Sequence, residues 1–140
     1  VTMKRCLAAT AALVLVFGLA TAQEGPPVTF NRGLAECAYP GASIDTLWSA
    51  AIKVFMTQSM GKGAVWQGSP VTPDRPSNIM RGTLVMGKGL TQWPAKLELL
   101  FEQDDSGTKI YCTVANQGPG KKGRQKVQLK FFAALDEALK

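Results

Sequence analysis

The chain has 140 residues, with 16 Lys and Arg against 10 Asp and Glu, and its formal net charge is +6. It contains no histidine. The usual base at neutral pH and the commonest zinc ligand are therefore absent, which excludes Ser-His-Asp triads and Cys-His nucleophilic pairs. The mild positive charge favours anionic partners and is too small to indicate nucleic-acid binding.

The N-terminal residues have the pattern of a secretory signal peptide. Lys4 and Arg5 precede an uncharged, mostly apolar run over residues 7–22, which ends in Ala20-Thr21-Ala22. A basic region, an apolar run and small residues at the end are typical of such a leader. We expect cleavage after Ala22, which would lower the net charge to +4. A membrane anchor is the alternative, but the run is shorter than the ~20 residues of a spanning helix.

The expected location follows from this leader. No later apolar segment is long enough to cross a bilayer, so we expect no transmembrane segment after processing. Lipid attachment would need a cysteine directly after the apolar run, and neither Cys6 nor Cys37 stands there. We expect a soluble protein of the bacterial periplasm or exterior. Its length predicts one domain at 43–140, after a flexible leader at 23–42 that is rich in Pro and Gly.

Residues 43–60 predict a helix. Ser43 suits the N-cap position, Asp45 lies in the first turn where the helix dipole favours it, and Gly61 marks the end. Apolar side chains recur at helical spacing and form a stripe that can face a core. The stripe consists of Ile44, Leu47, Trp48, Ala51, Ile52, Phe55 and Met56.

Four strands are predicted next, at 64–69, 78–86, 95–103 and 108–116. Apolar and polar residues alternate most regularly at 95–103, which indicates a sheet with one buried and one wet face. A tight hairpin is predicted at residues 104–107, a Pro-rich loop at 69–77 and a Gly-rich link at 87–93. Residues expected on the buried face are Met80, Leu84, Met86, Leu97, Leu99, Phe101, Ile110, Cys112 and Val114.

A second helix is predicted at 126–140. Its apolar stripe contains Val127, Phe131, Ala134, Leu135 and Ala138, widened by Leu129 and Phe132. The order helix, four strands, helix predicts an α+β two-layer sandwich, in which a four-stranded antiparallel meander packs on the N-terminal and C-terminal helices (α-β-β-β-β-α).

These segments, SIDTLWSAAIKVFM, IMRGTLVM, AKLELLFEQDDSGTKIYCTVAN and KVQLKFFAALDEAL, carry a resemblance over 43–140. The chain resembles small bacterial secreted proteins and lipoproteins of unknown function, and is similar to the helix-grip modules of outer-membrane assembly lipoproteins. The resemblance implies the fold and an envelope location. The chain departs from the lipoproteins because it lacks a lipid-acceptor cysteine, and no catalytic residue carries over.

The stretch GPGKKGRQK at 118–126 is similar to a phosphate-binding loop. Arg124 and Gln125 stand where such a loop has Lys and Ser or Thr, and no parallel sheet is predicted, which disfavours a nucleotide site. A solvated basic turn is the simpler interpretation. The functional alternative is a contact site for an anion or partner, formed by Lys121, Lys122, Arg124 and Lys126.

Other candidate sites are weaker. Cys37 and Cys112 form either a disulfide, which an oxidising compartment permits, or two separate thiols. Asp104 and Asp105 could be an acid/base pair, but their place before Ser106-Gly107 favours a turn. Trp66 and Trp93 either pack in the core or line the wet sheet face. No metal site or cofactor is predicted.

We therefore expect a non-enzymatic envelope protein that works by binding. Its partner would be an envelope protein or an anionic envelope component, contacted first by residues 121–126 and second by the exposed sheet face. One alternative is an inhibitor of a cell-envelope hydrolase that inserts the loop at 69–77. A small-ligand or anionic-lipid binding protein is another, and an enzyme of unusual chemistry is the remaining one.

Overall fold

A computed structural model describes residues 25–59, 71–86, 93–116 and 120–140 of the chain. The described residues form one antiparallel sheet and two helices. The elements in chain order are β1 (Thr29–Asn31), β2 (Leu34–Pro40), α2 (Ile44–Ser59), β3 (Thr72–Asp74), β4 (Ile79–Met86), β5 (Trp93–Asp104), β6 (Gly107–Val114) and α3 (Lys121–Ala138).

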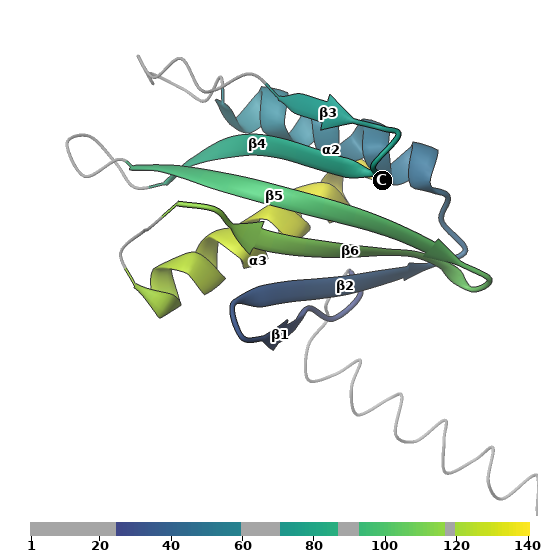
Figure 1. Ribbon diagram of the computed structural model, residues 1–140, viewed down its shortest axis with the longest axis horizontal. Coiled ribbons are helices and arrows are strands. Elements are labelled where there is room, and N and C mark those ends of the chain that lie inside the picture. The colour runs from purple at the N-terminus through teal and green to yellow at the C-terminus, as the bar shows by residue number, and fades with distance from the viewer. Residues whose placement is uncertain (1–24, 60–70, 87–92, 117–119) are drawn as a thin grey trace, which may run out of the picture.

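The two helices lie on one face of the sheet, so the molecule has two layers (Figure 1). The strand order is β1-β2-β6-β5-β4-β3, and all neighbours are antiparallel. Helix α2 packs mainly on β4, whereas α3 packs on β6, β2 and β4, and the two helices also contact one another. No described helix covers the opposite face, which we call the open face.

The buried face follows the alternation of the sequence. Along β5, Leu97, Leu99 and Phe101 are buried, whereas Lys96 and Glu102 on the other face are exposed. Successive side chains of a strand point to opposite faces of the sheet, so every second residue of each strand faces the core. The nine predicted inward residues of the three central strands are all buried except Val114, which packs against the core.

Helix α2 approaches the sheet closely at a glycine. Gly82 of β4 lies under Phe55, and a Cβ built on Gly82 would stand 2.4 Å from the Cγ of that ring. The ring of Phe55 packs edge-on against Phe131 of α3, with centroids 5.3 Å apart. Trp48 packs at 5.0 Å against Phe101 of the sheet. Glycine in this strand therefore gives the helix room to approach.

The predicted α+β class and antiparallel sheet are confirmed, but the predicted number of strands is wrong. The sheet has six strands instead of four. The segment expected to be a flexible leader contains β1 and β2, and β2 pairs with β6 along six positions. Ala35, Cys37 and Tyr39 point into the core, and burying these side chains favours the ordered strand.

The Pro-rich loop expected at 69–77 contains a further short strand, β3, which pairs with Ile79–Arg81 of β4 through three residues. The strand expected at 64–69 and the link at 87–93 fall largely outside the described residues. The tight hairpin is confirmed, because Asp104 pairs with Gly107 across Asp105 and Ser106. The Asp104 carboxylate accepts hydrogen bonds from the Ser106 N–H at 2.8 Å and from the Gly107 N–H at 3.1 Å.

Helix α3 begins five residues earlier than predicted, at Lys121. Lys, Arg and Gln are good helix formers, so the single Gly123, which costs about 1 kcal/mol, does not stop the helix. Its stripe differs from the prediction at two positions. Leu129 is exposed, whereas Gln128 is buried and donates hydrogen bonds to the carbonyl groups of Gly33 and Cys112 at 2.9 and 2.7 Å.

Candidate functional site

The cations predicted to form a basic turn lie in the first two turns of α3. Lys121, Lys122 and Lys126 are exposed, and Arg124 is half-buried. The interpretation of 121–126 as a turn is therefore wrong, because the backbone is helical there. The four cations remain together, since a helix places residues three and four positions apart on neighbouring parts of its surface.

This arrangement is unfavourable for the helix itself. The N-terminal end of a helix carries a partial positive charge, so cations there are repelled. The first turn of α3 contains no acidic residue, and Gly120 at the N-cap offers no side-chain hydrogen bond. The first N–H groups thus lack a side-chain cap, and such groups are the ones that bind anions. The local sequence therefore lowers the stability of this end of the helix.

Tertiary structure brings two more cations to the same end. Arg32 lies in the turn between β1 and β2, and Gly33 of this turn accepts the hydrogen bond from Gln128 of α3. Lys96 lies near the start of β5, beside the end of β6 (Figure 1). We call this group the basic end; it consists of Arg32, Lys96, Lys121, Lys122, Arg124 and Lys126.

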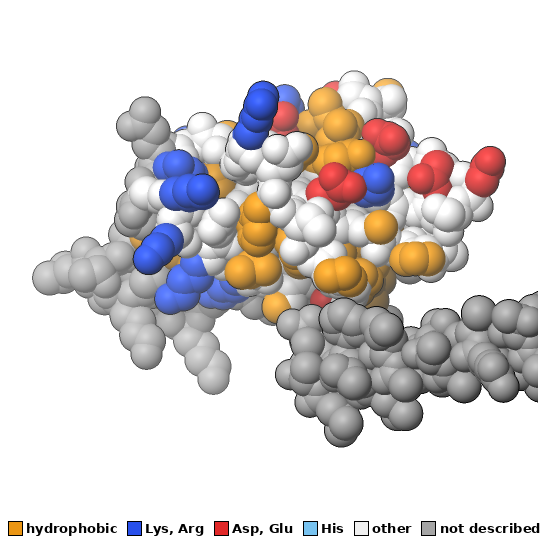
Figure 2. Space-filling model, turned by 90° about the horizontal axis from the view of Figure 1, so that it is seen from below, with side chains coloured by type: hydrophobic (Ala, Val, Ile, Leu, Met, Phe, Trp, Pro, Cys, Tyr) orange, Lys and Arg blue, Asp and Glu red, His pale blue; other side chains and the backbone are white. Residues whose placement is uncertain are grey.

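Four of the six described cations outside the basic end form ion pairs, whereas Lys53 and Lys130 form none with a described residue. Four ion pairs join Arg75 to Asp45, Arg81 to Glu98, Lys109 to Glu36 and Lys140 to Glu137, at 2.7–3.1 Å. The six cations of the basic end form no ion pair with another described residue. In Figure 2, Lys and Arg side chains gather toward the left, while Asp and Glu gather toward the right. On this side of the molecule most of the cations lie apart from the acidic side chains, although Lys or Arg side chains also occur among the acidic ones.

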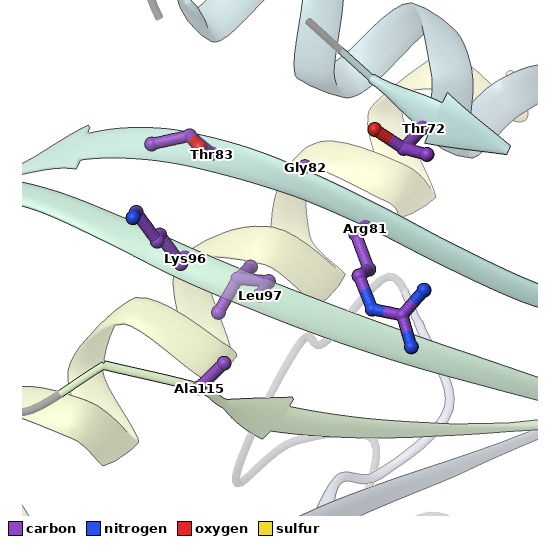
Figure 3. A pocket seen from close by; sticks show the side chains of 7 residues that line it. All are labelled: Thr72, Arg81, Gly82, Thr83, Lys96, Leu97 and Ala115. Carbon is purple, nitrogen blue, oxygen red and sulfur yellow. The ribbon is translucent and has the colours of Figure 1, made fainter. Parts of the chain in front are cut away.

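The open face of the sheet carries a first depression, of about 170 Å³, between β4 and β5. Gly82 and Leu97 face one another across its floor, flanked by Arg81 and Lys96 (Figure 3). The guanidinium of Arg81 points toward one end and the amino group of Lys96 toward the other. The Arg81 Nε donates to Glu98 at 2.9 Å. Because the two cationic groups diverge, this depression is not arranged around a single anion.

A second depression, of about 320 Å³, lies farther along the open face. It is lined by two leucines, two carboxylates, a hydroxyl and one aromatic ring, from Leu34, Glu98, Leu100, Glu102, Thr113 and Tyr111. Leu100 is directly opposite Tyr111 and exposes 41% of its surface, so a large apolar side chain faces solvent at the centre of the sheet.

The two cysteines within the described residues, Cys37 and Cys112, are buried as free thiols. Cys37 faces Ile110 and Cys112 faces Ala35, so the cysteines are diagonal neighbours on the core face. Cα atoms of such a pair are typically about 7–8 Å apart, beyond the range of most disulfides. Burial raises the pKa of the Cys37 thiol to about 11 and also raises the pKa of Cys112. Neutral, buried thiols are poor nucleophiles.

A small polar cluster joins β2 to the end of α3. The Tyr39 hydroxyl donates to Asp136 Oδ1 at 3.0 Å, and the Cys37 thiol donates to the Pro26 carbonyl at 3.7 Å. Gly25 packs tightly on the Asp136 carboxylate. Burial raises the pKa of Asp136 and of Tyr39. The cluster ties the N-terminal segment at 25–28 to the body of the protein.

The remaining predicted candidates have structural roles. The carboxylate of Asp104 caps the hairpin turn, and its hydrogen bonds with Ser106 lower its pKa. Trp93 packs against the core, which is one of the two positions predicted for it. Trp66 lies outside the described residues.

Sequence reasoning missed Arg32, Lys96 and the Tyr39–Asp136 pair. Arg32 and Gly33 both have positive φ, as a two-residue hairpin turn requires, but only Gly33 is a residue type that signals such a turn. The pairing of Tyr39 with a residue 97 positions away has no local signal.

The chain matches no protein-family model and no curated protein. Within the described ranges, neither helix is long and apolar enough to span a bilayer.

Proposed function

We propose that the protein is a secreted, non-catalytic binding protein of the bacterial envelope, and that its basic end contacts an anionic component. The observation that carries this proposal is the set of six unpaired cations at one end. Exposed cations close to one another repel, so the arrangement lowers stability unless an external anion neutralises it. The first N–H groups of α3 add to the positive potential at the same place.

The chemistry of the partner follows from this charge. Phosphate groups of lipids and phosphate or carboxylate groups of cell-wall polymers are the anions that an exported protein meets. Lysine is a flexible, strongly hydrated point charge, suited to many phosphates at a surface and less suited to one rigid ligand. A dispersed anionic surface therefore fits better than a single small anion.

The test is equilibrium binding of the processed protein to vesicles that contain phosphatidylglycerol, compared with vesicles of phosphatidylcholine alone. Binding to the anionic vesicles is expected to weaken as salt is raised, because exposed charges are screened. The variant K121A/K122A should bind about thirtyfold more weakly, since each of the two cations contributes about 1 kcal/mol near an anionic surface.

The matched control is K53A/K140A, which removes the same charge from two exposed positions outside the basic end, one on α2 and one after the end of α3. Equal weakening by both double variants would mean that only net charge matters, and would refute a localised contact. Absence of salt-sensitive binding to any anionic vesicle or isolated cell wall would refute the proposed function.

The hydrolase-inhibitor alternative needs a loop that projects from the body. Within residues 71–78, Arg75 pairs with Asp45 of α2 at 2.7 Å and lies 5.6 Å from the ring centroid of Trp48. These contacts hold the described part of the loop against α2. They favour binding through the basic end over insertion of this loop into an active site.

A further inference from the structure

Two side chains that line the second depression, Leu100 and Tyr111, belong to a row that crosses the open face of the sheet. Strand register places Glu36, Tyr111, Leu100 and Ile79 side by side on β2, β6, β5 and β4. Tyr111 therefore lies between a carboxylate and an apolar side chain. The Lys109 ammonium is 6.0 Å from the centroid of the Tyr111 ring, a cation–π contact that favours one position of the ring.

Charges around this depression are largely balanced. Glu98 pairs with Arg81 at 2.9 Å, and Glu36 pairs with Lys109 at 3.1 Å. Glu102 is the one carboxylate lining the depression that forms no ion pair with a described residue. A strongly charged ligand would find little net opposite charge here, so the surface favours a neutral ligand with polar groups. In this respect the depression differs from the basic end.

Its lining groups have complementary roles for such a ligand. Leu34, Leu100 and the ring of Tyr111 provide an apolar floor. Glu98 and Glu102 provide carboxylate oxygens that accept hydrogen bonds from hydroxyl groups, and such charge-assisted bonds are stronger than neutral ones. The volume of about 320 Å³ lies at the lower end of the roughly 300–1,000 Å³ of small-molecule sites.

We propose that this depression binds a neutral saccharide. A sugar ring has apolar C–H faces, which can pack on an aromatic ring, and a rim of hydroxyl groups, which can donate to carboxylates. Tyr111 and Leu100 meet the first requirement, and Glu98 and Glu102 meet the second. An alkyl chain would cover Glu102 without giving it a partner, and a basic peptide would find Glu98 already neutralised by Arg81. The saccharide site and the basic end are separate, so each can be tested alone.

The experiment is an NMR titration of the processed protein with the uncharged tetramer of N-acetylglucosamine. Millimolar or tighter binding is expected, with shifts in the amides of β5 and β6 around Leu100 and Tyr111. Y111A should weaken binding about tenfold, because it removes the aromatic contact, whereas Y111F keeps the ring and should retain most of the affinity. E102Q should also weaken binding about tenfold, since it removes a charged acceptor.

The matched control for E102Q is D105N, which removes one carboxylate in the neighbouring hairpin turn, outside the depression, and should leave binding unchanged. K121A/K122A and added salt should also leave it unchanged, which separates this site from the basic end. Absence of binding by the tetramer would overturn the proposal. So would equal binding by the wild type, Y111A and E102Q, or shifts confined to other elements. The spectrum of Y111A shows directly whether that variant is folded.

Discussion

Gly82→Ala tests the packing of α2 on the sheet. The added Cβ would stand 2.4 Å from Cγ of Phe55, where non-bonded carbon atoms normally stay about 3.5–4.0 Å apart. The ring or the strand must therefore move by about 1 Å. Phe55 is completely buried and packs on Phe131, so there is little free space for that movement.

Overpacking of this kind costs roughly 1–3 kcal/mol, partly offset by the ~0.5–1 kcal/mol that alanine gains over glycine in a strand. The free energy of unfolding, measured with urea, is expected to fall by about 1–2 kcal/mol. On heating, the midpoint of thermal unfolding should fall by about 4–8 °C for each kcal/mol. The same substitution in a Phe55→Ala background should be nearly neutral, because Cγ, Cδ1 and Cδ2, the atoms that the new Cβ meets, are gone. Equal losses in both backgrounds would refute the contact between Gly82 and Phe55.

Three further outcomes follow from the described contacts. Asp136→Asn keeps a hydrogen-bond acceptor for Tyr39. Burial raises the pKa of Asp136 in the folded state, so the stability of the wild type falls as pH rises from about 3.9 through that raised pKa. The variant should therefore gain stability relative to the wild type between about pH 4 and 7 in urea titrations, and a difference that does not change with pH would contradict this. Cys37 and Cys112 should resist a thiol reagent at pH 8 in the native protein and both react after unfolding without reductant; a requirement for reductant would reveal a disulfide. Lys121→Glu should stabilise α3 by roughly 0.5–1 kcal/mol through the helix dipole while weakening binding to anionic vesicles, and a loss of stability would show that the cation has a structural role.

The sequence predicted the elements whose patterns are local. In β5, polar and apolar residues alternate because one face is buried and the other is wet, so the inward side chains of Leu97, Leu99 and Phe101 could be read directly. In β2 the same alternation of Ala35, Cys37 and Tyr39 was present but lay among prolines and glycines, which are typical of a leader. The burial of this strand depends on α3, far along the chain.

The candidate sites also differ in how much of each could be predicted from local sequence. Lys121, Lys122, Arg124 and Lys126 are close in sequence, so their clustering was predictable, although the conformation was not. Arg32 joins them only because Gln128 of α3 contacts the turn between β1 and β2. The depression around Tyr111 depends on the register of three strands, which sequence alternation does not specify.

Hydrogen–deuterium exchange of the processed protein, with and without vesicles containing phosphatidylglycerol, tests the central claim most directly. Peptides covering the first turns of α3 and the turn at Arg32 should exchange more slowly when vesicles are present, while the hairpin at residues 104–107 should not change. Protection confined to the basic end is the expected result. Protection at the hairpin or across the whole chain, or no protection with any anionic vesicle, would contradict the assignment of the basic end as the contact surface.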